Sequence, residues 1–215
     1  MGDSIGLTAE EVLTTTRSVR KRLDLERPVS RETIMECIEI AHQAPTGSNN
    51  QGWSWMVIDD PDKKLAIAEH YRAIYWPYRE LADENRTEEE NAEPQRIRIS
   101  ASADHLADNF EHVPAMVIPL HAGRLEDANS FRQAGAWGSI LPAVWSFMMA
   151  LRSKGMGSAW TTLHLPRERE VAEICGIDYD NWTQAGLFPV AYTLGTDFKL
   201  ANRKPAEQFV HFNSW

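Results

Sequence analysis

The alternation of apolar and polar positions divides the N-terminal third of the chain into two short helices, a polar loop, a strand and a third helix. A capping box of Thr8 and Glu11 predicts the start of the first helix. The second helix begins after Ser30 and carries an apolar face at helical spacing. The residues of that face are Ile34, Cys37, Ile38 and Ala41. An apolar run at 53–58 predicts a buried strand, and Pro61 marks the start of the next helix.

The rest of the chain also alternates between helical and strand patterns. Residues 76–100 are rich in Glu and Arg and predict a solvated helical excursion, followed by helices at 102–110 and 166–175. Three more apolar runs predict strands, at 115–120, 158–163 and 186–194. Strands separated by several helices predict one α+β or mixed α/β domain over residues 1–215, which ends in an irregular tail from about residue 196.

The segment 134–151 contains no formal charge, and its length reaches the lower limit for a membrane span. Gly135, Gly138 and Pro142 interrupt it, and no second span accompanies it. We therefore expect a helix that is apolar all round because it is buried in the core or in a subunit interface. Pro142 should kink this helix or mark its first turn.

Composition narrows the classes of partner. The net charge of −9 argues against nucleic-acid binding, which needs a basic face, and against docking on an anionic membrane. Cys37 and Cys175 fall in helical patterns and predict buried thiols in a reducing compartment. The N-terminus lacks a basic region followed by an apolar run, so a cytoplasmic location is expected. The histidines are scattered without metal-ligand spacing, so no metal site is expected.

Two polar segments are candidates for binding chemistry. The loop Ala44–Trp53 contains Pro, Gly, Ser and Asn, which suit either an ordinary helix-to-strand connection or a cradle for a planar polar ligand. The segment Arg17–Arg20 puts two guanidiniums and a hydroxyl within four residues. This combination suits a phosphate, and it equally suits a basic helix end that complements the macrodipole. No dinucleotide-binding glycine motif or P-loop sequence occurs.

In order along the chain, these pieces resemble the FMN-dependent nitroreductase family. The matching segments are Arg17–Arg20, Ala44–Trp53, Gly138–Gly157, Ser158–Thr162, Gly195 and Arg203–Pro205. The resemblance covers about residues 8–75 and 105–210. It departs from the family pattern at Thr16, where an Arg is common, and at Gly52, where a Pro is common.

The resemblance implies an α+β fold, with a central, mostly antiparallel sheet flanked by helices and a long buried helix at a homodimer interface. FMN would lie at that interface, and the tail would dock on the partner subunit. The implied FMN-binding residues are Arg17, Ser18, Arg20, Arg203 and Lys204 for the phosphate and ribityl chain, with Pro45, Thr46, Gly47, Asn49, Ser139, Trp160, Thr161 and Thr162 along the ribityl chain and the ring. Arg203 and Arg72 are candidates for the positive charge near N1 of the reduced flavin.

The implied activity is transfer of a hydride from NAD(P)H to flavin N5, followed by reduction of an electron-poor small molecule such as a nitroaromatic, quinone or enone. The cycle would be ping-pong, and no side chain would act as catalytic acid or base. Two alternatives stay open. The protein could bind FMN without turnover, to sequester or deliver it, or it could be a specialised member such as a reductive dehalogenase or dehydrogenase. The excursion is either a lid over the substrate or a packing cluster, with aromatic residues at its start: Tyr71, Tyr75, Trp76 and Tyr78.

Overall fold

The computed structural model describes residues 4–215 and contains one five-stranded sheet. The strands are β1 (Trp53–Ile58), β2 (Ala115–Ala122), β3 (Met156–Ser158), β4 (Trp182–Gln184) and β5 (Phe188–Tyr192). Their order is β1-β2-β5-β3, and β4 pairs with β2 beyond the end of β5. Every named strand pair is antiparallel, as the family resemblance implied. The sheet is therefore assembled around β2, which pairs with three of the other strands.

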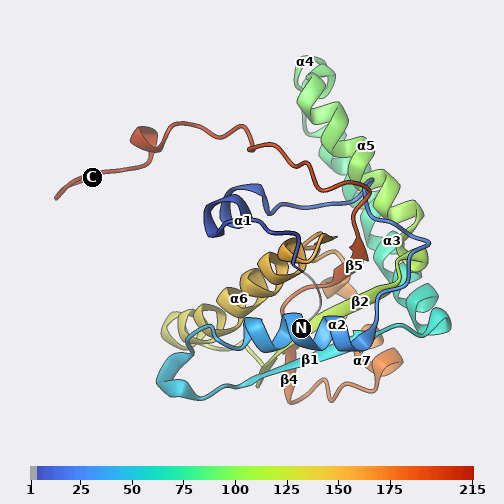
Figure 1. Ribbon diagram of the computed structural model, residues 1–215, viewed down its shortest axis with the longest axis vertical. Helices are drawn as coiled ribbons and strands as arrows, with labels where there is room; N and C mark the ends of the chain where they lie inside the picture. The colour runs from blue at the N-terminus through green and yellow to red at the C-terminus, as the bar shows by residue number, and fades with distance from the viewer. Residues whose placement is uncertain (1–3) are drawn as a thin grey trace.

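Helices cover both faces of this sheet (Figure 1). They are α1 (Ala9–Thr15), α2 (Arg31–Ala41), α3 (Pro61–Glu84), α4 (Glu88–Ala92), α5 (Pro94–Asp108), α6 (Ser130–Ser153) and α7 (Glu168–Cys175). The capping box of Thr8 and Glu11 is formed at α1, and Ser30 caps α2, so both predicted helix starts are confirmed. At the other end of the chain, α7 stops at Gly176, which adopts a left-handed conformation.

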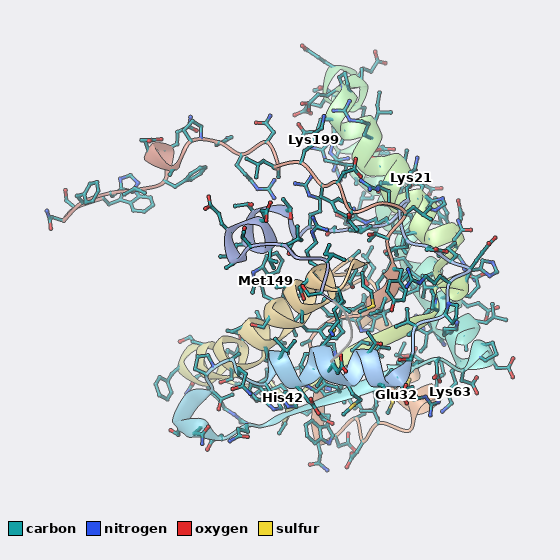
Figure 2. The ribbon with its side chains drawn as sticks, viewed as in Figure 1. Lys21, Glu32, His42, Lys63, Met149 and Lys199 are labelled. Atoms are coloured by element: carbon teal, nitrogen blue, oxygen red, sulfur yellow. The ribbon has the colours of Figure 1, made fainter. Side chains whose placement is uncertain are left out.

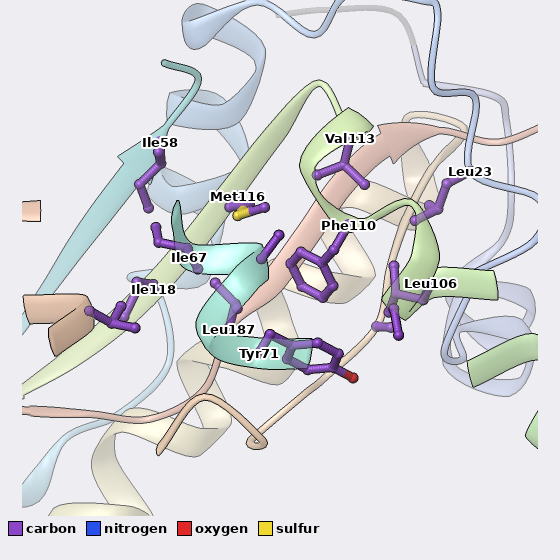
Figure 3. Close-up of a cluster of buried hydrophobic side chains, with 14 of the residues drawn as sticks. Leu23, Ile58, Ile67, Tyr71, Leu106, Phe110, Val113, Met116, Ile118 and Leu187 are labelled. Atoms are coloured by element: carbon purple, nitrogen blue, oxygen red, sulfur yellow. The ribbon is translucent and has the colours of Figure 1, made fainter. Parts of the chain in front are cut away.

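Two hydrophobic clusters hold the layers together, one on each face of the sheet. The side chains of β2 alternate between them, because successive residues of a strand point to opposite faces. Met116 and Ile118 belong to the cluster under α3, α5 and α7, whereas Ala115 and Val117 belong to the cluster under α2 and α6. Figure 3 shows the first cluster, in which the ring of Tyr71 packs against that of Phe110 with centroids 4.7 Å apart.

Both cysteines are buried and free, which confirms the prediction of buried thiols. Burial raises the pKa of Cys37 to about 12 and that of Cys175 to about 11. The unreactive thiol form is therefore favoured at both positions.

Several predicted boundaries are wrong. The helix that begins at Pro61 continues to Glu84, and α5 begins at Pro94 rather than near residue 102. The excursion 76–100 is thus made of the end of α3, all of α4 and the start of α5, and none of its residues is buried. The composition of residues 76–100 correctly predicted that they are exposed, but it did not predict that α3 continues through Pro77.

The strand pattern was also misread near residue 160. The strand β3 ends at Ser158, so residues 159–163 are not part of it, and Thr161 forms an isolated bridge with Leu187 instead. The three-residue strand β4 was not predicted. Pro142 lies in the interior of α6 rather than in its first turn, because that helix begins at Ser130.

By length and composition, α6 is apolar enough to cross a membrane, and 44% of its most apolar window is buried within this chain. The buried side of α6 packs on α2 and the sheet. Its other side lines an apolar groove of about 610 Å³ together with α1 and the end of α2. Met149 lies on this side, and Figure 2 shows it between α6 and α1.

The tail leaves the body of the protein after residue 195 and extends away from it (Figure 1). Its first part runs along the segment after α1, where Arg17 donates to the carbonyl of Lys199 and Arg22 donates to that of Leu194. Its last residues are exposed although several are large and apolar, among them Phe209, Val210, Phe212 and Trp215. Such a segment has little within its own chain to pack against.

Candidate functional site

A cavity of about 350 Å³ lies between the end of the sheet and the helices α3 and α5. Its floor contains Arg20 together with Trp160, Thr161 and Thr162, which come from opposite ends of the sequence. They meet because the segment after α1 joins the sheet beside β3: the N–H of Val19 donates to the carbonyl of Ser158 at 2.8 Å.

The segment 160–164 is fixed firmly to the sheet. Thr161 exchanges both backbone hydrogen bonds with Leu187, at 3.2 and 2.9 Å, and its hydroxyl also donates to the Leu187 carbonyl at 2.7 Å. The indole N–H of Trp160 donates to the carbonyl of Ala185 at 3.3 Å. Thr162 differs from these residues, because it is exposed and its N–H has no backbone acceptor within the described part of the chain. The N–H of this exposed residue is thus available to a ligand.

Gly186 makes this close packing possible. Its φ is +150°, a conformation that residues with a side chain rarely adopt. A Cβ added there would lie 2.8 Å from both the Trp160 indole nitrogen and the Phe188 ring. A side chain at this position would therefore displace the floor of the cavity.

His164 anchors the other end of the segment, and its role was missed from the sequence. The ring is fully buried, and its Nε2 lies 3.1 Å from the side-chain oxygen of Gln184 on β4. Burial lowers the pKa of His164 to about 4, which the hydrogen bond to Gln184 only partly opposes. The imidazole is therefore neutral near pH 7, and its Nδ1 has no partner within the described residues.

Arg20 faces the cavity as a partly buried cation without a carboxylate partner. Burial lowers its pKa, which the nearby phenols of Tyr71 and Tyr75 partly offset. Among the described residues its guanidinium has no ion pair. An unpaired, partly desolvated cation of this kind is ready to receive an anionic or electron-rich group.

Arg17 lies apart from Arg20, in a second cluster of cations. Its Nε is buried without a partner, as are Nη1 of Arg152 and the hydroxyl of Ser158, and all three residues border one small cavity. Burial lowers the pKa of Arg152, and the like charges of Arg22 and Arg17 lower it further. Ser18 is exposed beside this cluster. Arg152 was missed from the sequence, because it lies in the last turn of α6, far along the chain from Arg17.

The loop after α2 is held to α6 by Ser139. The Ser139 hydroxyl accepts from the N–H of Gly47 at 3.1 Å, so two of the predicted segments do meet. Although the loop contains Gly47 and Gly52, φ is positive at Ser48, Asn49 and Gln51 instead. Three non-glycine residues with positive φ in one loop indicate stored backbone strain, which is typical of functional sites. Pro45 borders the apolar groove, and the Thr46 hydroxyl accepts from the N–H of Gln51 at 3.1 Å.

The remaining candidate cations behave differently from one another. Arg203 and Lys204 lie exposed on the tail, and Arg203 donates only to the carbonyl of the residue before it. Arg72 forms an ion pair with Glu111 at 2.5 Å and is not part of the cavity lining. The described residues contain no cluster of His, Cys, Asp or Glu that could hold a metal ion.

The aromatic residues at the start of the excursion fall into two groups. Tyr71 and Tyr75 are buried in the core cluster, and they also form part of the cavity wall with Tyr78. Trp76 points elsewhere and is partly exposed. Tyr71 and Tyr75 therefore pack in the core and also line the cavity.

Within one chain, the predicted site residues form separate groups. Figure 1 shows the loop between α2 and β1 at one end of the molecule and α4 at the opposite end. The tail with Arg203 and Lys204 extends in a third direction. One copy thus presents the parts of the predicted site, but it does not assemble all of them.

Comparison with known proteins agrees with this architecture. The model of the nitroreductase family matches residues 13–192. The chain belongs to the nitroreductase family. Family membership supports a flavin-dependent oxidoreductase as its general class. No curated protein matches the sequence.

Solved structures share the fold at low sequence identity. A BluB-like flavoprotein from Clostridium difficile 630 has a TM-score of 0.70 with 18% identity, over 97% of this chain and 100% of that one. Oxidized iodotyrosine deiodinase bound to FMN and 3-iodo-L-tyrosine has a TM-score of 0.71 at the same identity and coverage. The FMN and NADPH-dependent nitroreductase NfnB from Sphigopyxis sp. strain HMH has a TM-score of 0.69, again at 18% identity and the same coverage.

Proposed function

We propose that this protein is an FMN-dependent oxidoreductase that takes a hydride from NAD(P)H and reduces an electron-poor small molecule. The observation that carries the proposal is the cavity floor, where an unpaired Arg20 meets the available N–H of Thr162 on a segment locked to the sheet. A rigid floor with a cation and an outward N–H suits a planar cofactor ring that accepts hydrogen bonds and gains negative charge on reduction.

The donor set near Arg17 fits the anionic end of FMN. The buried nitrogens of Arg17 and Arg152 lie beside the exposed residue Ser18, and within residues 4–215 no carboxylate is hydrogen-bonded to either guanidinium. A phosphate accepts charge-assisted hydrogen bonds from such groups. Arg17, Ser18 and Arg20 are therefore the residues proposed to hold the phosphate and ribityl chain, joined by Arg203 and Lys204 when the tail is docked.

A second copy of the chain would complete the site. The loop residues Pro45, Thr46, Gly47 and Asn49, with Ser139 behind them, are presented outward at the end of the molecule opposite α4. The apolar groove along α6 and the exposed apolar residues of the tail supply surface that a homodimer would bury. In the proposed homodimer, the loop of each copy closes the cavity of the other.

Bound FMN would supply the redox chemistry, since its N5 can take a hydride from NAD(P)H and then reduce the acceptor in a ping-pong cycle. The protein would contribute binding and electrostatics. Thr162 is placed to donate its N–H to the ring, and Arg20 adds positive charge beside it. Arg72 is a poor candidate for that charge, because Glu111 already neutralises it.

Anaerobic reduction tests the proposal. Purified protein supplied with FMN should retain it, absorb near the flavin band at about 450 nm and lose that absorbance when NADPH or NADH is added. A protein that cannot bind FMN would contradict the proposal. A protein that binds FMN but keeps it oxidised under excess NADPH and NADH would instead be one that sequesters or delivers the cofactor.

Arg20 offers a test at the level of one residue. Arg20→Ala should weaken FMN binding by about 1.5–3 kcal/mol, the scale of a hydrogen bond to a charged group. Lys21→Ala is the matched control, because Lys21 is the exposed neighbouring cation and does not line the cavity. Equal FMN affinities for the two variants, measured by quenching of flavin fluorescence, would remove Arg20 from the site.

A further inference from the structure

The cavity has a charge opposite to that of the whole chain. The net charge is −9, yet four arginines line this cavity and no Asp or Glu does. They are Arg20, Arg79, Arg86 and Arg96. A basic pocket in an acidic protein concentrates anions locally while the remaining surface repels them.

Two of these arginines are neutralised by the protein itself. Arg79 forms ion pairs with Asp83 and with Asp104, the latter at 3.2 Å, and Arg86 lies 3.5 Å from Asp83. The Arg79–Asp104 pair fastens the end of α3 to α5, whereas the two contacts of Asp83 are local to the end of α3. These ion pairs leave Arg20 and Arg96 as the lining cations that have no ion pair among the described residues.

Arg96 is a cavity-lining cation that is available to bind an anionic ligand. Its Nε is buried without a hydrogen-bond partner, and its side chain comes from the first turn of α5. Glu90, whose pKa is lowered in small part by Arg96, is instead held by the N–H and hydroxyl of Thr87 at the start of α4. Arg20 lies on the floor that the proposed function assigns to FMN, whereas Arg96 lines the cavity from α5.

The space beside Arg96 is lined by flat and apolar side chains. Tyr75 and Tyr78 of α3 form one wall, and Ile99 and Ala103 of α5 form another. The hydroxyl of Tyr75 is already engaged, since it donates to Asp104 at 2.5 Å. An aromatic ring would therefore find apolar contact here and few competing polar groups.

We infer that this enzyme selects electron acceptors that carry an anionic group on an aromatic ring, with Arg96 binding the anion and the tyrosine wall binding the ring. The inference rests on the proposed function, because it names the acceptor class for the same cavity. A carboxylate is the simplest anion that accepts two parallel hydrogen bonds from a guanidinium.

Two probes of the same shape test the preference in the flavin-loaded protein. 4-Nitrobenzoate carries the anion, and 4-nitrobenzamide replaces it with a neutral amide. In either case two electrons reduce the nitro group to nitroso. NADPH supplies them as a hydride and becomes NADP⁺, and the oxygen that the nitro group loses leaves as water after taking up that hydrogen and one proton. The expected kcat/KM for 4-nitrobenzoate exceeds that for 4-nitrobenzamide by about 10- to 100-fold, the range of a charge-assisted hydrogen bond.

Arg96→Gln should abolish this preference by lowering kcat/KM for 4-nitrobenzoate about 10- to 100-fold, to the level for 4-nitrobenzamide. Arg96→Lys keeps the charge and should restore part of the preference. Arg98→Gln is the matched control, because Arg98 lies on the same helix, is exposed and does not line the cavity. Arg98→Gln should leave kcat/KM for both probes unchanged. Calorimetric titration with benzoate supplies a readout without turnover: Arg96→Gln should weaken benzoate binding about tenfold or more, whereas Arg98→Gln should not.

The outcomes separate this inference from the proposed function. Reduction of both probes with equal efficiency, or equal effects of Arg96→Gln and Arg98→Gln, would overturn the anion preference and leave the oxidoreductase standing. If neither probe is reduced and neither NADPH nor NADH reduces the flavin, the proposed function fails. The benzoate titration then decides on its own whether Arg96 binds anions.

Discussion

The floor of the cavity and the segments proposed to close it are held by the fold in very different ways. The floor, Trp160–His164, is tied to β4 and to the connection between β4 and β5 by backbone and side-chain hydrogen bonds, and Thr161 and His164 are buried. The loop that contains Gly47 is exposed, strained at three residues and joined to α6 through Ser139. The tail is exposed along most of its length.

This difference shows how one chain can carry a site without completing it. The rigid groups proposed to meet a cofactor ring lie in segments that are hydrogen-bonded to the sheet, where packing fixes their positions. Groups that would close the site are displayed on the surface, where another copy can receive them. The following changes should therefore disturb stability at the floor and FMN affinity at the loop.

The largest effect is expected at Gly186. Gly186→Ala should lower the free energy of unfolding by about 3–5 kcal/mol, because backbone strain adds to a clash with Trp160 and Phe188. Gly176→Ala is the control, since Gly176 also has a positive φ but has no neighbour where a Cβ would lie. Gly176→Ala should lower the free energy of unfolding by only about 1–2 kcal/mol. Urea unfolding measures both, and equal losses would show that the floor is not tightly packed against Gly186.

Acid should loosen the floor through His164. The pKa of His164 is about 4 in the folded protein and about 6.5 in the unfolded chain, so the unfolded chain binds the extra proton between these values. The stability contributed by the neutral ring is present above about pH 6.5 and falls by about 3 kcal/mol as the pH approaches 4.

His164→Gln removes this titration and keeps an amide that can pair with Gln184. The stability of the wild-type protein should therefore fall more steeply with decreasing pH than that of the variant. Urea unfolding at a series of pH values measures the two curves. Parallel curves would mean that His164 does not titrate as its burial implies.

A smaller effect is expected at the loop. Ser139→Ala removes the acceptor for the Gly47 N–H and should weaken FMN binding by about 0.5–1.5 kcal/mol, with little change in unfolding temperature. Ser130→Ala, at the exposed start of the same helix, is the control. Equal FMN affinities for the two variants would mean that α6 does not position the loop.

Local sequence patterns were sufficient to predict most of the helices and the central strands. The capping box at Thr8, the cap at Ser30 and the apolar face of α2 are short-range features, and each was read correctly. The antiparallel order of the sheet was implied only by the family resemblance, because strand pairing joins distant parts of the chain.

The parts of the site that escaped prediction depend on contacts between distant residues. Arg152 approaches Arg17 only after α6 has packed, and His164 becomes buried only when β4 forms. The continuation of α3 through Pro77 was not predicted either. A charged composition indicates that a segment is exposed to solvent, but it does not indicate where a helix ends. The positive φ angles at Ser48, Asn49 and Gln51 have no composition signal of their own.

The central claim is that each FMN site combines the cavity of one copy with the loop of another, and a mixed dimer tests it most directly. Arg20→Glu reverses the charge of the floor, and Gly47→Trp blocks the loop at a backbone position that accepts a side chain. Each variant alone should fail to retain FMN. A heterodimer of the two contains one site in which both parts are intact, so it should bind about one FMN per dimer by absorbance at about 450 nm. A heterodimer that binds no FMN would contradict the account.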